Sequence, residues 1–424
     1  MKKVSTAVVV SSAVLALTLT GCSTKANDSG SGGGGGGAGG VKTDIGVTES
    51  EINLGIQTDS SGVFKVTGLG LTNGNQMWAE DVNNEGGICG RDIKLDIQDN
   101  GYKPDNALPI YEQQKTTQLG YLQLLGSPIL AALKQKIIAD KMVSVTASWA
   151  SQNLDAPEVL MIGQTYDVEI INGLSWMQEQ GMIGEGDKIG HIFIDSEYGQ
   201  NGVMGSKYYA EQNGMTVVEA PVAGTDTDMT AIVAKMKDEG VKAIAITVAP
   251  AATASIAVQN VNQGLNVPIL GSNPTFAPNL LADPAVTAAL SNYYQVNSIL
   301  PFTADSEFGK ELAEKYSSEF TDPPSHAVFA GYVAGMVWGE ILKQACDDGD
   351  LTRDGILKAK AKVTEVDTQG LMGPLDLSKE GSPTSREAVI MQADPTVADK
   401  GGLKVVVDFF ESDAAKEYKA PFEK

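Results

Sequence analysis

Short β-branched segments alternate with longer amphipathic segments along most of this chain, and that alternation limits the fold more than any other feature of the sequence. The segments predicted as strands are residues 52–57, 93–98, 121–126 and 142–147. The amphipathic segments between them, predicted as helices, include residues 75–84 and 128–141. Regular strand–helix alternation is typical of a parallel β-sheet with helices on both faces. The sequence therefore predicts an α/β fold.

A second series of the same kind follows the first. Its predicted strands are residues 188–194, 216–220, 241–248 and 267–270. Its predicted helices are residues 201–213, 229–240 and 252–264. Two series of similar period predict two Rossmann-like lobes, since one hydrophobic core rarely covers a chain of this length. The cleft between such lobes is the expected binding site, because strand C-termini and helix N-termini converge there.

The later apolar segments 327–345 and 405–412 have no strand series of their own and are expected to complete the two lobes. The N-terminal lobe is predicted to comprise residues 51–166 and 299–385. The C-terminal lobe is predicted to comprise residues 167–298 and 386–424.

The N-terminus carries the pattern of an export signal. Lysines at positions 2 and 3, an apolar run and small residues predict a secretory signal peptide at residues 1–21. The Leu-Thr-Gly-Cys sequence that ends at Cys22 resembles the lipobox of bacterial lipoproteins, which implies cleavage before Cys22 and a lipid on its sulfur. The alternative is a lone cysteine after an ordinary signal peptide. The glycine-rich residues that follow predict a lipidated flexible tether over residues 22–50. We therefore expect a cell-envelope protein, held on the membrane by its lipid and facing the periplasm or the exterior.

Composition argues against several function classes. Cleavage removes two lysines, so the formal net charge changes from −22 to −24, and such an acidic domain repels nucleic acid. Two histidines and three cysteines are too few for the usual zinc sites, so no metal or cofactor is expected. No nucleophile elbow or Walker loop is present, and the spacing of Gly68, Gly70 and Gly74 does not fit a dinucleotide loop. These glycines are expected to allow close packing or to present a helix N-terminus to a ligand.

Two cysteines remain after the lipidation site. In an exported protein such a pair favours a disulfide, so Cys89 and Cys346 are predicted to be bonded.

The segment 195–199 follows a predicted strand and opens a helix. Its residues Asp195, Ser196 and Glu197 are expected to cap that helix. Tyr198 is a candidate for the cleft, because a tyrosine offers a flat apolar face with one hydroxyl.

The two histidines have different contexts. His191 lies inside an apolar strand and is expected to be a core residue, whereas His326 is expected in a loop with no acid or nucleophile pattern beside it.

Several segments resemble one family in the expected order. Residues 81–107 resemble an Asn-x-x-Gly-Gly-x-x-Gly-(Arg/Lys) turn and the loop after the second strand. Residues 192–202, 224–246 and 370–383 resemble its entry to the second lobe, a following helix–strand unit and a late glycine-containing segment. The family is the leucine/isoleucine/valine-binding proteins, type I periplasmic binding proteins of ATP-driven importers, and the resemblance covers about residues 51–412.

The resemblance implies a bilobal receptor, expected as a monomer, that closes on a small ligand and delivers it to a membrane permease and ATPase. In this family backbone amides and hydroxyls of the first lobe hold an amino acid's carboxylate. The matching positions here are Ser127, Thr146, Ala147 and Ser148. Tyr198 matches a tyrosine that contacts ligand across the cleft.

Three positions depart from the family's pattern. A second-lobe tyrosine falls near Ala249, the acid that pairs with a ligand ammonium falls on Asn273, and a first-loop aromatic falls near Thr67 with Phe64 close by. Asparagine cannot neutralise an ammonium, and an unpaired buried charge costs about 3–5 kcal/mol. The ligand is therefore expected to be amino acid-like only if another acid, such as Asp283 or Asp195, replaces the missing one.

Otherwise the pattern fits an aromatic or branched aliphatic carboxylic acid, or a neutral amide. Trp149, next to Ser148, is a candidate wall of the site or a packing residue. The leading prediction is thus a transport receptor. A ligand-sensing module is the alternative, and an enzyme is a third possibility that no motif supports.

Overall fold

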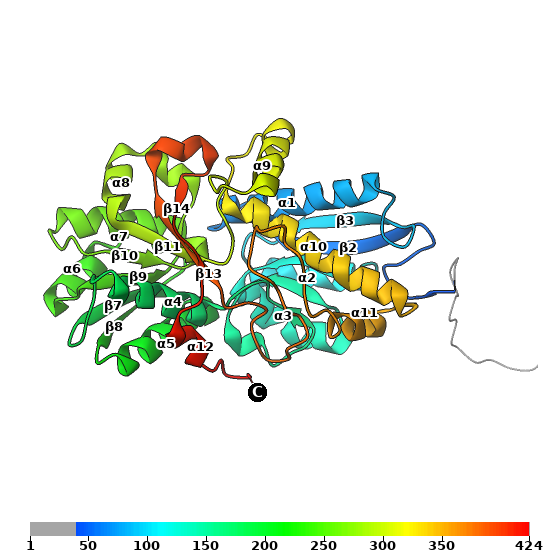
Figure 1. The fold of residues 1–424 in the computed structure, drawn as a ribbon, viewed down its shortest axis with the longest axis horizontal. Helices are drawn as coiled ribbons and strands as arrows, with labels where there is room; N and C mark the ends of the chain where they lie inside the picture. Colours follow the sequence, from blue (N-terminus) through cyan, green and yellow to red (C-terminus); the bar gives the residue numbers. More distant parts are fainter. Residues whose placement is uncertain (1–39, 424) are drawn as a thin grey trace, which may run out of the picture. The chain divides into compact units, whose positions relative to one another are not determined.

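The computed structural model describes residues 40–423, and Figure 1 shows their arrangement. The predicted signal peptide, the predicted lipidation site at Cys22 and most of the predicted tether lie outside these residues. Strand β1 (Lys42–Thr43) pairs with β12 (Asp350–Leu351), and Val47 is buried. Packed structure therefore begins before residue 51, so the predicted tether of 22–50 is too long at its C-terminal end.

The first large sheet has five parallel strands in the order β3-β2-β4-β5-β6. Its strands are β2 (Glu51–Thr58), β3 (Asp92–Asp99), β4 (Gly120–Leu125), β5 (Ser144–Ala147) and β6 (Val159–Leu160). The helices that accompany it are α1 (Lys65–Asn84), α2 (Pro104–Gln114), α3 (Ser127–Asp140), α9 (Glu307–Glu319), α10 (His326–Asp347) and α11 (Arg353–Lys360), with the 3₁₀ turn η1 (Ser151–Asn153).

The second large sheet has seven strands in the order β14-β13-β11-β10-β9-β7-β8. Its parallel strands are β7 (Lys188–Ile194), β8 (Thr216–Val222), β9 (Ala243–Thr247), β10 (Ile269–Gly271) and β11 (Tyr293–Asn297). Strands β13 (Ala388–Ala393) and β14 (Leu403–Phe410) extend it in the antiparallel sense. The helices are α4 (Tyr166–Glu179), α5 (Glu197–Gln212), α6 (Thr230–Glu239), α7 (Pro250–Asn262), α8 (Pro284–Ala289) and α12 (Asp413–Glu417). The 3₁₀ turns are η2 (Asn273–Thr275), η3 (Pro278–Ala282), η4 (Leu290–Asn292) and η5 (Pro395–Lys400). The predicted α/β class with two sheets is confirmed.

The chain passes between the two sheets three times. It leaves the first sheet after β6, returns after β11 and leaves again before β13. These connections, residues 161–165, 298–306 and 378–387, are called crossovers below. Hydrogen bonds tie them together, since the Gln164 backbone N–H donates to Ser298 Oγ (3.1 Å) and the Gly163 N–H to Thr384 Oγ1 (2.8 Å).

Helix α1 begins ten residues earlier than the sequence predicts. Its first half contains Gly68, Gly70 and Gly74. Glycine has a low helix propensity, so the local sequence does not predict a helix there. The glycines are there because α10 lies directly against α1: a Cβ on Gly74 would meet the Val328 carbonyl oxygen at 2.0 Å. The expectation of close packing is therefore correct, and the predicted start of this helix at residue 75 is wrong.

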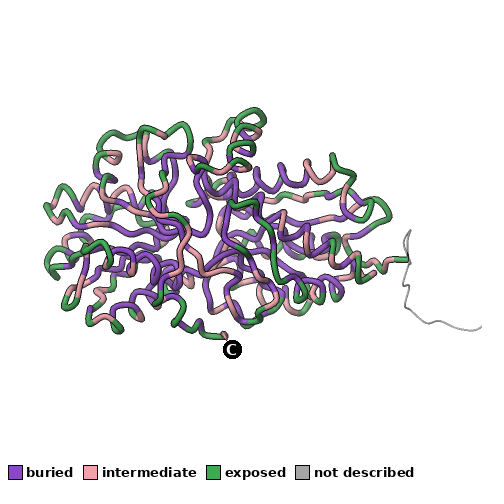
Figure 2. The backbone as a smooth tube through the Cα atoms, viewed as in Figure 1, coloured by how far each residue is buried: buried purple, intermediate pink, exposed green. Residues whose placement is uncertain are grey.

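Helix α10 is apolar over nearly its whole circumference, as expected for a helix buried on all sides. Figure 2 shows buried segments running along this helix and through both sheets. No helix among residues 40–423 is both long enough and apolar enough to cross a membrane.

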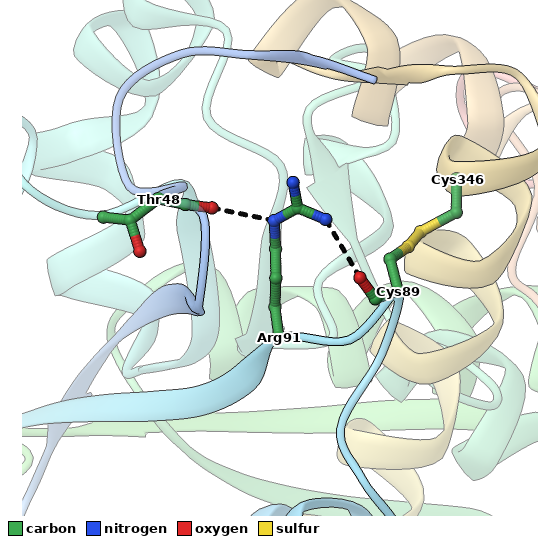
Figure 3. The surroundings of a disulfide bond; sticks show 4 residues. All are labelled: Thr48, Cys89, Arg91 and Cys346. Atoms are coloured by element: carbon green, nitrogen blue, oxygen red, sulfur yellow. Dashed lines mark hydrogen bonds between the residues drawn. A yellow bond between two sulfur atoms is a disulfide. The ribbon is translucent and has the colours of Figure 1, made fainter. Parts of the chain in front are cut away.

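The predicted disulfide is confirmed and joins the turn after α1 to the end of α10. Cys89 and Cys346 are bonded, with their Cα atoms 6.3 Å apart (Figure 3). Cys89 has a φ of 53°, a left-handed conformation that bends the turn toward α10. Arg91, only 2% exposed, donates to the carbonyl oxygens of Thr48 (2.7 Å) and Cys89 (3.0 Å) and so holds the turn in place.

Candidate ligand-binding site

A cavity lies where the two lobes meet and extends into the first lobe; it is called the main cavity. Its apolar lining comes from α1, β4, β5, α10 and the crossovers: Leu71, Leu122, Val145, Ile162, Ile299, Ala327, Ala330, Ala334 and Met372. Its polar lining comprises Thr67, Asn75, Gln123, Thr146, Gln164, Glu169, Asn273, Asn297, Ser298 and His326, and Ala147 and Trp149 complete it. Of these residues only Glu169 and His326 carry an ionisable side chain.

A second cavity, called the side cavity, has five aromatic residues among the eleven that line it. The Tyr198 ring lies 4.6 Å from that of Tyr166 and 6.3 Å from that of Phe64, and Phe64 lies 4.9 Å from Tyr102. Burial raises the pKa values of Tyr166 and Tyr198 well above the usual range, so both hydroxyls stay protonated. These rings line the space beside Ser127.

The serine hydroxyls predicted to hold a carboxylate bind each other. Gly126, with a φ of 115°, turns the chain from β4 directly into α3, which places Ser127 at the side cavity. Ser127 Oγ lies 2.8 Å from Ser148 Oγ, and both residues are buried. The Thr146 hydroxyl donates to the Ser148 carbonyl oxygen (3.0 Å). Thr146 lines the main cavity, Ala147 lines both cavities, and Ser148 lines neither.

The predicted second-lobe residues also separate. Tyr198 lines the side cavity, and its hydroxyl lies 2.8 Å from Ser272 Oγ. Ala249 caps α7 and lines neither cavity, whereas Asn273 lines the main cavity. Trp149 borders both cavities while its indole N–H donates to the Ile162 carbonyl oxygen (3.0 Å).

The prediction that side chains of residues 195–197 cap the start of α5 is wrong. Ser196 is the N-cap residue, but its side chain makes no capping bond. Asp195 instead accepts a hydrogen bond from Gln200, and Glu197 accepts one from Asn153.

Glu169 is the acid that the cavity contains. Its Oε1 accepts from Asn273 Nδ2 (2.9 Å) and its Oε2 from the Asn273 backbone N–H (3.2 Å). Burial raises the pKa of Glu169 to about 8, against the lowering effect of both Asn273 bonds. The side chain is therefore neutral at pH 7. Asp195 and Asp283, the acids considered from the sequence, are exposed and line neither cavity.

Of the two histidines, His191 lies in the core and His326 lines the main cavity. His191 is a core residue as predicted, bonded through its two ring nitrogens to Ser206 Oγ (2.7 Å) and Thr247 Oγ1 (3.0 Å). His326 is not in a loop as predicted, since it is the first residue of α10 and lines the main cavity. Burial lowers the pKa of His326 to about 4 although a hydrogen bond to the Asn273 backbone opposes this, so the ring is neutral at pH 7.

Sequence reasoning also missed Gln164 and Asn297, which reach the main cavity from the first crossover and from the end of β11. Neither position carries a local signal, because each looks like an ordinary polar residue next to a strand. Glu169 likewise resembles any first-turn acid of a helix. Only the meeting of the two lobes brings these residues together.

Comparison with known proteins supports the same architecture. The family model described as periplasmic binding protein matches residues 51–402. A fatty acid ABC transporter substrate-binding protein from Thermomonospora curvata is 38% identical, with 91% of this chain and 99% of that chain covered and a TM-score of 0.88. A comparison with curated protein sequences finds no match.

More distant structures share the fold. A branched chain amino acid ABC transporter protein from Thermus thermophilus with bound valine is 16% identical, with 87% and 99% of the two chains covered and a TM-score of 0.75. A solute-binding protein from R. palustris in complex with benzoate is 15% identical, with 86% and 99% covered and a TM-score of 0.69. The predicted resemblance and the predicted two-lobed fold are thereby confirmed.

Proposed function

The chain belongs to the periplasmic binding protein family, the substrate-binding proteins of ABC transporters, and we propose that its ligand is a carboxylic acid with a long apolar body, such as a fatty acid. The observation that carries this proposal is the main cavity, whose exposed lining is mostly apolar and whose two ionisable groups, Glu169 and His326, have pKa values that burial shifts toward their neutral forms. The fatty acid substrate-binding protein that is 38% identical supports the same class of ligand.

An apolar chain fits the part of the cavity that enters the first lobe. There α1, α10 and the sheet present aliphatic side chains, among them Leu71, Val145 and Ala334. Burying each methylene group of a ligand contributes about 0.8 kcal/mol, which is about fourfold in affinity. Affinity is therefore expected to rise with chain length until the cavity is full.

A free amino acid fits poorly by comparison. An ammonium group would need an ionised partner, but burial keeps Glu169 protonated, and both of its oxygens already accept bonds from Asn273. Beside Ser127, where the family resemblance puts the amino acid's carboxylate, the hydroxyls of Ser127 and Ser148 bind each other, and the side cavity is bordered by aromatic rings.

Delivery to a permease and its ATPase follows from the family, whose members act outside the cytoplasm. We propose that a lipid on Cys22 holds the protein at the membrane surface as a monomer, within reach of its permease.

The test is a thermal-shift series of straight-chain acids of increasing length, with benzoate, leucine and valine as comparisons. A ligand at one hundred times its dissociation constant should stabilise the protein by about 2.7 kcal/mol. Long-chain acids should produce such a shift and the amino acids should produce none. A shift with leucine or valine and none with any acid would refute the proposal.

A further inference from the structure

We propose that the side-chain amides of Gln164, in the first crossover, and Asn297, at the end of β11, are the donors that bind the carboxylate of the ligand. This inference rests on the proposed function and names the groups that select the head of the ligand. Both residues line the main cavity, and both are nearly inaccessible to solvent, at 1% and 4% exposed. Gln164 Nε2 and Asn297 Nδ2 have no hydrogen-bond partner in the protein.

The orientation of the Asn297 amide is set by the backbone. Its Oδ1 accepts from the backbone N–H groups of Ser298 (2.8 Å) and Ile299 (3.3 Å). A backbone N–H can only donate, so the oxygen must face those groups and the NH₂ must face away from them. The free atom of Asn297 is therefore a donor.

The orientation of the Gln164 amide is set through Asn172. The Ser412 backbone N–H donates to Asn172 Oδ1 (2.9 Å), so Asn172 Nδ2 is the donor to Gln164 Oε1 (2.9 Å). Asn172 Nδ2 also donates to the Arg386 carbonyl oxygen (2.9 Å), which requires the same orientation. Gln164 Nε2 is thus a second free donor.

Two buried donors without an acceptor require an explanation, because each such group costs about 1–3 kcal/mol. The Gln164 backbone N–H donates to Ser298 Oγ (3.1 Å), so Gln164 lies next to the residue that follows Asn297. Two N–H donors from adjoining parts of the cavity lining suit the two oxygens of one carboxylate. These two donors offer nothing to an ammonium group, which can only donate; the free acceptor in the same lining is the neutral amide oxygen Asn75 Oδ1.

Isosteric acids provide the sharpest test. In Asn297→Asp and Gln164→Glu the accepting oxygen of each side chain remains, while the free donor becomes an oxygen. At pH 8 each variant should bind dodecanoate at least about 100-fold more weakly than the wild type, through loss of a charge-assisted hydrogen bond and repulsion between carboxylates. Dodecanamide, whose NH₂ can donate to the new carboxylate, should bind these variants more tightly than dodecanoate does.

Asn100→Asp is the matched control. Asn100 is buried, its Oδ1 accepts from the Tyr102 N–H (2.8 Å) and its Nδ2 has no partner, yet it lines neither cavity. This variant should bind dodecanoate as the wild type does. For each variant, the affinities for dodecanamide and dodecanoate are measured on the same folded protein. Their ratio therefore does not depend on whether the substitution lowers the stability of that protein.

The outcomes separate the two proposals. Lost dodecanoate binding and reversed preference in both cavity variants, with an unchanged control, support the inference. If the wild type binds dodecanoate and the cavity variants keep its affinity and its preference for the acid, the inference is overturned while the proposed function stands. If the wild type binds no long-chain acid, the proposed function is overturned and the inference falls with it.

Discussion

Glu169→Gln tests whether the acid in the main cavity is neutral in the folded protein. The pKa of Glu169 is raised from 4.5 to about 8, so between these pH values the native state keeps a proton that the unfolded chain has lost. The free energy of unfolding then falls as pH rises, by about 1.4 kcal/mol per pH unit for one proton. Glutamine cannot ionise, so this dependence disappears in the variant.

The quantity to measure is the wild-type free energy of unfolding minus that of the variant, from urea denaturation at pH 5.5, 6.5 and 7.5. This difference should fall by about 2.7 kcal/mol across the series. The bond from the Asn273 N–H to Glu169 Oε2 is lost in the variant, which adds an offset that does not depend on pH. The histidines with lowered pKa values titrate in both proteins and cancel.

Glu239→Gln serves as the control, because Glu239 is exposed and its bond to Lys188 lowers its pKa. The same difference should not change with pH for this variant. A constant difference for Glu169→Gln would show that Glu169 is ionised in the native cavity. The cavity would then hold a negative charge suited to an ammonium group, and the argument against amino acid ligands would fail.

Three further predictions concern the framework of the cavity. Gly74→Ala should lower the free energy of unfolding by about 1–3 kcal/mol, because the new Cβ would meet the Val328 carbonyl oxygen at 2.0 Å. Gly339→Ala should be neutral or stabilising, because its Cβ would lie 3.6 Å from Trp78. Both variants are compared by chemical denaturation, and equal effects would contradict the prediction. Replacing both Cys89 and Cys346 by serine opens a loop with a sequence separation of 257, so the free energy of unfolding should fall by as much as about 5 kcal/mol; no loss against the oxidised wild type in urea would contradict it. Ala334→Phe should fill the apolar end of the main cavity and weaken long-chain acids at least tenfold more than short ones in calorimetry, and an equal effect on both would contradict this assignment.

Local sequence signals were sufficient for most of the fold. The β-branched runs that became β2, β4, β7 and β9 are found where they were predicted, because strand patterns depend on side chains a few residues apart. Helix α1 is the informative failure. Its glycines lower local helix propensity, and only the packing of α10 against them explains why they are there.

The binding site was harder to predict because, like the start of α1, it depends on contacts between segments that are distant in the sequence. The positions that the family resemblance implied, such as Ser127 and Thr146, do lie at the cavities, but their hydroxyls are already engaged. Gln164 and Asn297 matter because one amide nitrogen of each has no partner among the described residues. For Gln164 this depends on Asn172, which Arg386 and Ser412 orient from more than 200 positions away along the chain.

The sequence alone determined the α/β class, the two series of strands and helices, the disulfide partners and the resemblance to a family of binding proteins. Each of these depends on local pattern, residue count or a motif. The tertiary structure alone decided that an apolar cavity enters the first lobe, that Glu169 and His326 are neutral there and that two amide donors remain free. Burial, pKa and hydrogen-bond satisfaction are properties of the assembled neighbourhood, which three passages of the chain between the lobes bring together.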